Sequence, residues 1–254
     1  MILVIDVGNT HTVFGCVNKK DEIIHTMRLV TDRSETEFGY ASKIKDLLEI
    51  GGIEKNEITG VIISSVVPLV TASLKKASKL LFKLEAKVVG ENVKTGLDIL
   101  LEGGIAPDLE VAAVAAKEDY PLPCIIADLG TATTVTVVNK EGAYIGGAIL
   151  PGVGISINSL VDSTSLLPGI AIEKPSKAIA TETTDAMKSG IVYGSAGALD
   201  GIIDHFIDEM GQEPASIVAT GGIGGLIAPV CRHDIVIDDN LLLKGLIKIY
   251  KMNN

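Results

Sequence analysis

Hydrophobic positions in the first half of the chain fall into short buried runs and helical repeats. Runs of apolar or alternating residues predict strands at 2–5, 12–17, 22–30, 60–67 and 86–89. Apolar residues three and four apart predict helices over 34–51, 71–84 and 109–117. The inner face of the first helix is expected to hold Phe38, Ala41, Ile44, Leu47 and Leu48.

The second half repeats this order of elements. Strands are predicted at 124–126, 133–139, 143–149 and 217–219, and helices over about 153–163 and 183–210. Three strands, a helix, a strand and a helix therefore occur twice, which indicates an α/β architecture other than a simple βαβ alternation. We place the boundary near 118–122, giving an N-terminal half of 1–118 and a C-terminal half of 119–254.

The turn after the first predicted strand carries the first candidate chemistry. The buried run ends at Asp6 and is followed by Gly8, Asn9 and Thr10, of which Gly accepts any φ and Asn tolerates the left-handed region. Such a turn offers backbone N–H groups to an anion, and Mg²⁺ could lie between the carboxylate and a phosphate. An ordinary hairpin with a polar turn explains these residues equally well.

The same pattern recurs in the second half. Another buried run ends at Asp128 and is followed by Gly130, Thr131 and a strand rich in Thr and Val. Aligning the two aspartates places Gly8 on Gly130 and Thr10 on Ala132. Two Asp-x-Gly hairpins at the starts of two similar halves indicate an internal duplication, with two related domains facing a shared cleft.

Composition excludes several classes of function. The 254 residues carry a net charge of −10 and no cluster of Lys and Arg, so a nucleic-acid partner is disfavoured. Mean hydropathy is high at +0.40, but no apolar stretch is long enough for a confident membrane span and no leader precedes the first strand. The four histidines lack zinc-site spacing. We expect a cytoplasmic protein without a membrane partner, with buried thiols at Cys16, Cys124 and Cys231.

Eight motifs together resemble a known family. They are Asp6-Val-Gly-Asn-Thr10, Ile63-Ser-Ser-Val-Val-Pro68, Lys94-Thr-Gly-Leu-Asp-Ile99, Asp128-Leu-Gly-Thr-Ala-Thr-Thr134, Gly146-Gly147 with Pro151-Gly152, Ser189-Gly-Ile-Val-Tyr-Gly194, Thr220-Gly-Gly222 and Leu241-Leu-Leu-Lys-Gly-Leu246. In this order, and over the whole chain, they resemble type III pantothenate kinase. The resemblance implies a duplicated ribonuclease-H-like (actin-like ATPase) fold and ATP-dependent phosphorylation of pantothenate, an early step in coenzyme A biosynthesis.

The resemblance also implies the nucleotide and metal residues. Asp6 is the candidate ligand for Mg²⁺, and the resemblance matches Asp128 to a residue that binds a monovalent cation, K⁺ or NH4⁺. It matches Gly221 and Gly222 to the place where this superfamily lays adenine against backbone. No P-loop or protein-kinase signature is present. The full set of implied ATP-binding residues is Asp6, Val7, Gly8, Asn9, Thr10, His11, Thr12, Val13, Thr131, Gly221 and Gly222.

The acceptor site departs from the family pattern of Gly-x-Asp-Arg. The Asp, implied as the general base, falls on Asp108, but Gly is replaced by Ala106 and Arg by Leu109. Pantothenate is a carboxylate, for which Arg is the natural bidentate partner, and Glu110 would repel it if it pointed inward. Asp108 could equally serve only as the N-cap of the following helix. The implied substrate-binding positions are Pro107, Leu109 and Thr184.

Two functions of different class follow from this pattern. The first is an ATP-dependent kinase of pantothenate, weakened or re-tuned to a related alcohol. The second is a non-catalytic nucleotide-binding paralogue that acts as a regulatory or interaction protein. The long predicted helix carries glycines that fit close packing inside the domain or a homodimer interface, and the resemblance favours the dimer. These glycines are Gly190, Gly194, Gly197 and Gly201.

Overall fold

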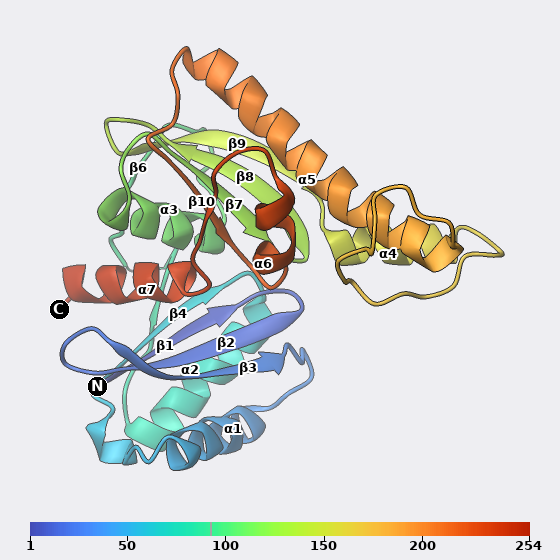
Figure 1. Ribbon diagram of the computed structural model, residues 1–254. Helices are drawn as coiled ribbons and strands as arrows, with labels where there is room; N and C mark the ends of the chain where they lie inside the picture. Colours follow the sequence, from blue (N-terminus) through green and yellow to red (C-terminus); the bar gives the residue numbers. More distant parts are fainter. Residues whose placement is uncertain (92) are drawn as a thin grey trace. The chain divides into compact units, whose positions relative to one another are not determined.

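A computed structural model describes residues 1–91 and 93–254 and divides them into two compact units. The first unit comprises 1–97, 103–115 and 241–254, and the second comprises 98–102 and 116–240. Each unit is built on one mixed β-sheet with helices (Figure 1). The division differs from the sequence-based boundary after residue 118, because the last fourteen residues belong to the first unit.

The first unit contains a five-stranded sheet in the order β3-β2-β1-β4-β5. The hairpin strands β1, β2 and β3 pair antiparallel, whereas β1–β4 and β4–β5 are parallel. Its strands are β1 (Ile2–Val7), β2 (His11–Val17), β3 (Ile23–Val30), β4 (Gly60–Ser65) and β5 (Lys87–Val88). Its helices are α1 (Glu37–Ile50), η1 (Lys55–Glu57), α2 (Pro68–Phe82), most of α3 (Pro107–Asp119) and α7 (Leu241–Met252).

Alternation along β1 creates two hydrophobic cores in this unit. Leu3 and Ile5 pack in one core with residues of α1 and α2, the two helices that lie on one side of this sheet in Figure 1. Val4 points to the opposite face, where it packs with Val111 of α3 and Leu246 of α7. Because successive strand side chains point to opposite faces, Asp6 lies on the side of α3 and α7.

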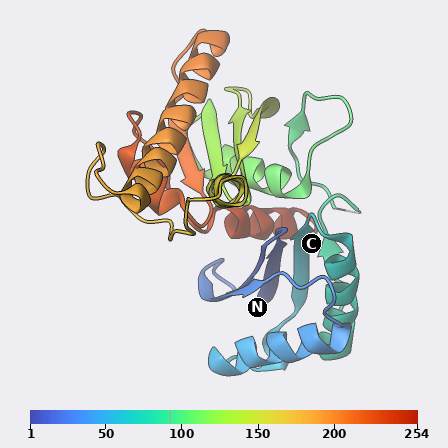
Figure 2. The ribbon, with the colours of Figure 1, turned by 90° about the vertical axis from the view of Figure 1, so that its right-hand side faces the viewer.

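The second unit contains a six-stranded sheet in the order β11-β10-β7-β8-β9-β6. Its strands are β6 (Asp98–Ile99), β7 (Cys124–Leu129), β8 (Ala132–Val138), β9 (Ala143–Pro151), β10 (Ser216–Thr220) and β11 (Val236–Ile237). Its helices are α4 (Val153–Asp162), α5 (Thr183–Met210), α6 (Gly224–Ile227) and η2 (Ala228–Val230). The long helix α5 runs over one face of this sheet, and its N-terminal part projects beyond the strands together with α4 (Figures 1 and 2).

Strand order confirms the internal duplication. In both units a three-stranded antiparallel meander is followed by two parallel strands beside its first strand, so that β1, β2, β3, β4 and β5 correspond to β7, β8, β9, β10 and β11. Strand β6 is an addition at one edge of the second sheet. The sequence predicted this repeated α/β fold correctly.

Two details of the predicted pattern are wrong. Phe38 is 70% exposed, and Tyr40 takes its place in the core, because α1 begins only at Glu37 after its N-cap Thr36. The two hairpins also differ in length: Asp6 pairs with Val13, seven residues on, whereas Asp128 pairs with Thr134, six residues on. The alignment of Thr10 with Ala132 is therefore off by one residue.

The remaining sequence predictions concern cysteines and membrane spans. All three cysteines are free thiols, Cys16 and Cys124 buried as expected and Cys231 only partly buried. Among the residues that the structure describes, no helix is both long and apolar enough to cross a bilayer.

Candidate active site

The turn between β1 and β2 is held in a fixed shape. Gly8 N–H donates to the carbonyl of His11 at 2.9 Å and closes the hairpin. The Thr31 hydroxyl donates to the carbonyl of Gly8 at 2.8 Å, and the Thr31 N–H donates to that of Thr10 at 2.8 Å. The fully buried Thr12 hydroxyl lies 2.9 Å from that of Thr31. Thr31, which the sequence analysis missed, thus fixes the loop that the resemblance assigns to phosphate.

Two guanidinium groups border this turn. Arg33 donates to Asn9 Oδ1 at 3.1 Å, and Arg28 lies 3.0 Å from His11 Nδ1. Partial burial, and then the charge of Arg28, lower the pKa of His11, so its ring is neutral at pH 7 and accepts from Arg28. Neither arginine forms an ion pair with an acidic side chain of the described residues. Their charge therefore remains available to an anion at the turn.

Asp6 lies at the end of β1, beside the parallel strand β4. Its register partner is Ser64, so the two side chains lie on the same face of the sheet. The described residues contain no cluster of three or more His, Cys, Asp or Glu side chains that could hold a metal. One carboxylate among oxygen-bearing side chains nevertheless fits Mg²⁺, which takes one or two carboxylates and completes its shell with water and substrate phosphates.

The second hairpin forms the corresponding site in the other unit. Asp128 at the end of β7 pairs with Thr220 at the end of β10. Gly221 follows with φ +91°, and a Cβ there would lie 2.6 Å from Asp128 Oδ1 and 2.6 Å from the carbonyl oxygen of Leu129. The Thr-Gly-Gly turn and the Asp128 hairpin are remote in sequence, but the backbone of Gly221 packs directly against the carboxylate of Asp128. A glycine is required at 221 because both the space and the φ exclude a side chain.

The motif at the end of β9 supports the same turn. A Cβ on Gly152 would lie 2.1 Å from the carbonyl oxygen of Thr131 and 2.7 Å from that of Gly130. The lack of a side chain lets the start of α4 approach the backbone of the loop. Gly152 thus packs against the backbone of Thr131, the implied phosphate contact, and supports the loop there.

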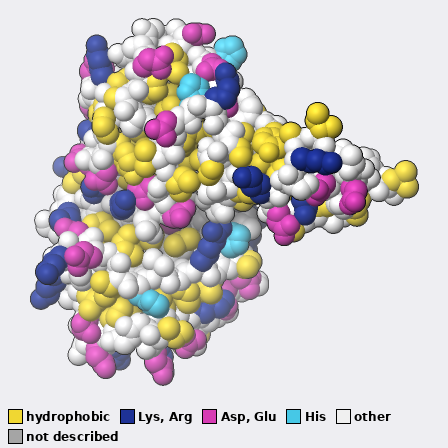
Figure 3. All heavy atoms as spheres, viewed as in Figure 1, with side chains coloured by type: hydrophobic (Ala, Val, Ile, Leu, Met, Phe, Trp, Pro, Cys, Tyr) yellow, Lys and Arg dark blue, Asp and Glu magenta, His cyan; other side chains and the backbone are white. Residues whose placement is uncertain are grey.

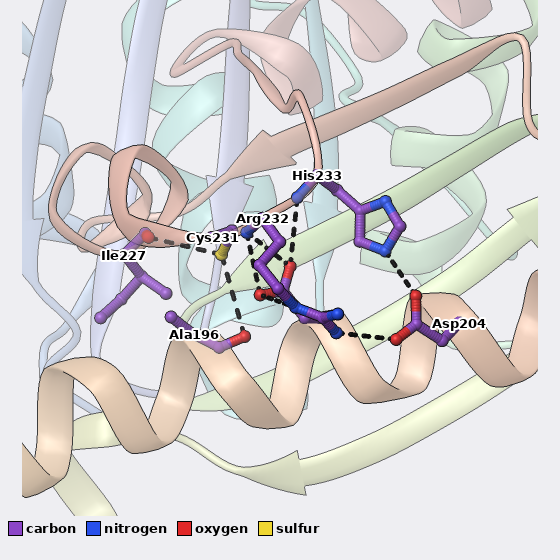
Figure 4. A network of polar contacts seen from close by, with 7 residues as sticks. Ala196, Asp204, Ile227, Cys231, Arg232 and His233 are labelled. Carbon is purple, nitrogen blue, oxygen red and sulfur yellow. Dashed lines mark hydrogen bonds and ion pairs between the residues drawn. The ribbon is translucent and has the colours of Figure 1, made fainter.

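The segment after Gly221 and Gly222 is fastened to α5. The buried carboxylate of Asp200 accepts the backbone N–H of Arg232 at 2.9 and 3.0 Å and that of His233 at 3.3 Å. Figure 4 shows the side chains of Arg232 and His233 both reaching Asp204, at 2.7 and 2.8 Å. Hydrogen bonds from these two side chains lower the pKa of Asp204. The implied adenine turn therefore leads into a segment whose far end is pinned.

The candidate base Asp108 lies in the first turn of α3. The helix begins at Pro107, so Asp108 is already inside it and is not its N-cap; its carboxylate accepts the N–H of Leu109 at 2.9 Å. Asp108 is therefore not the N-cap residue itself, although its carboxylate does accept one of the first-turn N–H groups that have no partner within the helix. Burial raises the pKa of the Asp108 carboxyl, although that hydrogen bond acts in the opposite direction. A carboxylate with a raised pKa is suited to accept a proton.

The neighbours of Asp108 show how the divergent acceptor motif is arranged. Glu110 accepts a hydrogen bond from the Thr95 hydroxyl at 2.5 Å. This contact gives Thr95 of the Lys94-Thr-Gly motif a structural role. It also engages one oxygen of the Glu110 carboxylate, the group that could have repelled an anion. Leu109 is partly buried and offers no charge. Thr184, in the first turn of α5, is exposed and belongs to the second unit.

Comparisons with known proteins agree with this arrangement. A model of the type III pantothenate kinase family matches residues 2–205. Two relatives named type III pantothenate kinase, from Halalkalibacterium halodurans and Bacillus cytotoxicus, are each 42% identical over the whole chain and over 100% and 97% of their own lengths. Among solved structures, a putative Baf family transcriptional activator from Campylobacter jejuni matches with TM-score 0.60 at 18% identity, covering 99% of this chain and 98% of that one.

A second solved structure is similar in fold. The activator of 2-hydroxyisocaproyl-CoA dehydratase from Clostridium difficile, with bound ADPNP, matches with TM-score 0.57 at 12% identity over 98% of this chain and 92% of that one. The duplicated sheets and Asp-x-Gly hairpins thus define a protein of the actin-like ATPase and sugar-kinase fold. Within it, the chain belongs to the type III pantothenate kinase family and is an ATP-dependent kinase.

Proposed function

We propose that this chain transfers a phosphoryl group from ATP to a hydroxyl of pantothenate. The observation that carries the proposal is the pair of Asp-x-Gly hairpins, at Asp6 and Asp128, in a chain that aligns end to end with kinases of that name. Phosphoryl transfer passes through a loose transition state, so that the protein contributes mainly alignment and charge neutralisation. The two hairpins supply both.

Each part of the site has a role in this proposal. The turn at Gly8–Thr10 and Thr131 bind the phosphates through backbone and hydroxyl groups, while Gly221 and Gly222 lie against adenine. Arg28 and Arg33 add positive charge beside the first turn. Asp6 and Asp128 are the ligands for Mg²⁺ and for K⁺ or NH4⁺. Bound Mg²⁺ supplies neutralisation of the phosphate charge.

Asp108 is the general base that takes the proton of the acceptor hydroxyl. Burial raises the pKa of the Asp108 carboxyl, which makes the carboxylate a stronger base towards the proton of the hydroxyl. Pro107, Leu109 and Thr184 complete the acceptor site in this proposal. Leu109, standing where the family has Arg, supports a weakened hold on the pantothenate carboxylate. A lost charge-assisted contact costs about 1.5–3 kcal/mol, or roughly one to two decades in kcat/KM.

We also propose a homodimer that uses α5. At all four glycines of this helix, a Cβ would meet nothing within 4 Å, so close packing within the chain, the simpler interpretation, does not explain them. Several large apolar side chains nearby are exposed, and Figure 3 shows hydrophobic side chains together with charged ones over the projecting part of the unit. A cavity of about 330 Å³ lies between α4 and α5. The apolar residues are Ile155, Leu160, Leu166, Ile179 and Tyr193.

Light scattering on dilute protein tests the dimer. Twice the chain mass of 26.5 kDa is expected, and a clean mass near 26.5 kDa contradicts the proposal. Replacing Gly194 or Gly197 with Leu should give folded monomer, because the replaced surface is open within the chain. A variant that fails to fold would instead indicate packing inside the unit.

A coupled ADP-release assay with Mg²⁺ and K⁺ tests the reaction. Pantothenate and neutral analogues such as pantetheine are compared at saturating ATP. Turnover of pantothenate with a raised KM supports the proposal, and a preference for the neutral alcohol indicates a re-tuned site. Tight ATP binding without turnover of any alcohol favours the second candidate, a non-catalytic nucleotide-binding regulator, for which Leu109 is the specific observation.

A further inference from the structure

One buried hydroxyl lacks any hydrogen-bond partner. Among the residues that the structure describes, Ser64 Oγ is the single buried side-chain nitrogen or oxygen atom without a partner. Ser64 has no exposed surface and lies near the end of β4. Buried hydroxyls are almost always bonded, because an unmade hydrogen bond inside a protein costs free energy. This exception therefore calls for a functional cause.

The position of Ser64 identifies that cause. Along the same face of the sheet, Val4 of β1 pairs in register with Ile62 of β4, and both belong to the hydrophobic core. Two residues further on, Asp6 pairs with Ser64. The face thus changes from apolar to polar at one pair of positions, and the polar pair consists of the implied metal ligand and the unpartnered hydroxyl. Ser64 does not bond to Asp6 itself, since it has no partner.

We propose that Ser64 is a positioning residue for the Asp6 centre. Its hydroxyl hydrogen-bonds to a water molecule of the Mg²⁺ shell once the metal–nucleotide complex is bound, and it thereby orients the ligands around Asp6. The proposal rests on the proposed function, because it requires nucleotide and metal at this hairpin. It also gives a role to the Ser-Ser motif after Ile63, which the nucleotide contacts leave unexplained.

The adjacent serine shows that the role is specific to one face of the strand. Ser65 points away from Asp6, and its Oγ accepts the N–H of Val67 at 3.0 Å in the turn that leads into α2. Ser65 thus has a structural bond and Ser64 has none. For folding alone alanine would fit at position 64 without the cost of an unmade bond, whereas alanine at position 65 would lose one.

The test compares Ser64→Ala with Ser65→Ala. Affinity for ADP is measured by calorimetry in Mg²⁺ and in EDTA, Mn²⁺ affinity by electron paramagnetic resonance in the presence of ADP, and Tm without ligand. Ser64→Ala should weaken binding about tenfold or more in the presence of metal, the usual effect of losing a partner that orients a metal ligand. Its affinity in EDTA should be unchanged, and its Tm equal to that of the wild type or higher.

Ser65→Ala should behave in the opposite way, with a Tm lower by about 2–4 °C and unchanged metal-dependent affinity. The inference is overturned if Ser64→Ala binds ADP normally in Mg²⁺, loses affinity equally in EDTA, or melts as low as Ser65→Ala. If the wild type binds no nucleotide with metal, the proposed function fails as well. Normal wild-type binding with an unaffected Ser64→Ala variant refutes the role of Ser64 alone.

Discussion

Replacing Gly221 with Ala tests the junction between the Asp128 hairpin and the Thr-Gly-Gly turn. The new Cβ would lie 2.6 Å from Asp128 Oδ1 and 2.6 Å from the carbonyl carbon of Leu129, and backbone at that distance must shift. The residue would also have to hold φ +91°. The unfavourable φ costs about 1–2 kcal/mol, and the forced shift about 1–3 kcal/mol. The free energy of unfolding should therefore fall by roughly 2–5 kcal/mol.

Gly211→Ala is the matched control. Gly211 ends α5 in the same unit with φ +65°, and a Cβ there would meet nothing within 4 Å. It should incur only the cost of its φ, about 1–2 kcal/mol. The difference between the two variants isolates the contact of residue 221 with Asp128.

Urea denaturation gives the stabilities, and calorimetry with ADP gives the functional consequence. Because the shift moves Asp128 or the turn that we propose lies against adenine, Gly221→Ala should lose at least about tenfold in ADP affinity, equivalent to about 1.4 kcal/mol. Gly211→Ala should bind ADP as the wild type does. Equal stability of the two variants, with equal ADP affinity, would refute the close approach at Gly221.

Three further substitutions test other parts of the structure. Asp108→Asn should abolish turnover yet raise Tm at pH 7. Burial raises the pKa of this carboxyl in the folded state, so the wild type loses stability as pH rises through that pKa. The gain in Tm of the variant should therefore vanish below the unfolded pKa near 3.8. A gain that persists in acid would contradict this cause. Asp200→Ala should lower the free energy of unfolding in urea by about 2–4 kcal/mol, and Asp204→Ala, whose carboxylate is partly exposed, should lower it much less; similar losses would show that Asp200 does not fasten 232–233 to α5. Arg33→Met should weaken ATP binding by about 1.5–3 kcal/mol with little change in Tm, and unchanged binding would remove Arg33 from the phosphate site.

The repeated fold was predictable because its central strands β1 and β7 are buried on both faces. Leu3, Val4 and Ile5 are fully buried, so their run is continuous in the sequence, and the same is true of Ile125 and Ile126. Helix α5 has the predicted bounds, since the helix ends at Gly211 in the left-handed conformation. Continuous apolar runs and turn-forming glycines can both be seen locally in the sequence, so these elements could be predicted from it.

Other features depend on contacts remote in sequence. The short strand β6 and the helix α7 were not predicted, because β6 is defined by pairing with β9, and α7 by packing its apolar face on α3 and β1. The same limit applies to the site. Thr31 and Arg33 lie more than twenty residues from the turn that they contact, and no local pattern marks them. Asp108 was found by resemblance, and only the structure shows that it lies inside the first turn of α3 and not at the N-cap position.

The inclusion of α7 in the first unit bears on how the protein is made. Synthesis delivers β1 early, but Leu243, Leu246 and Ile249, which cover Val4 on that sheet, follow only after the whole of 116–240. Domains generally fold as units in order of their emergence. Here the first unit exposes one apolar face of its sheet until α7 has been synthesised, whereas 116–240 emerge as one continuous stretch. The second unit is therefore free to fold before the first, and loss of α7 would uncover one face of the sheet that contains β1.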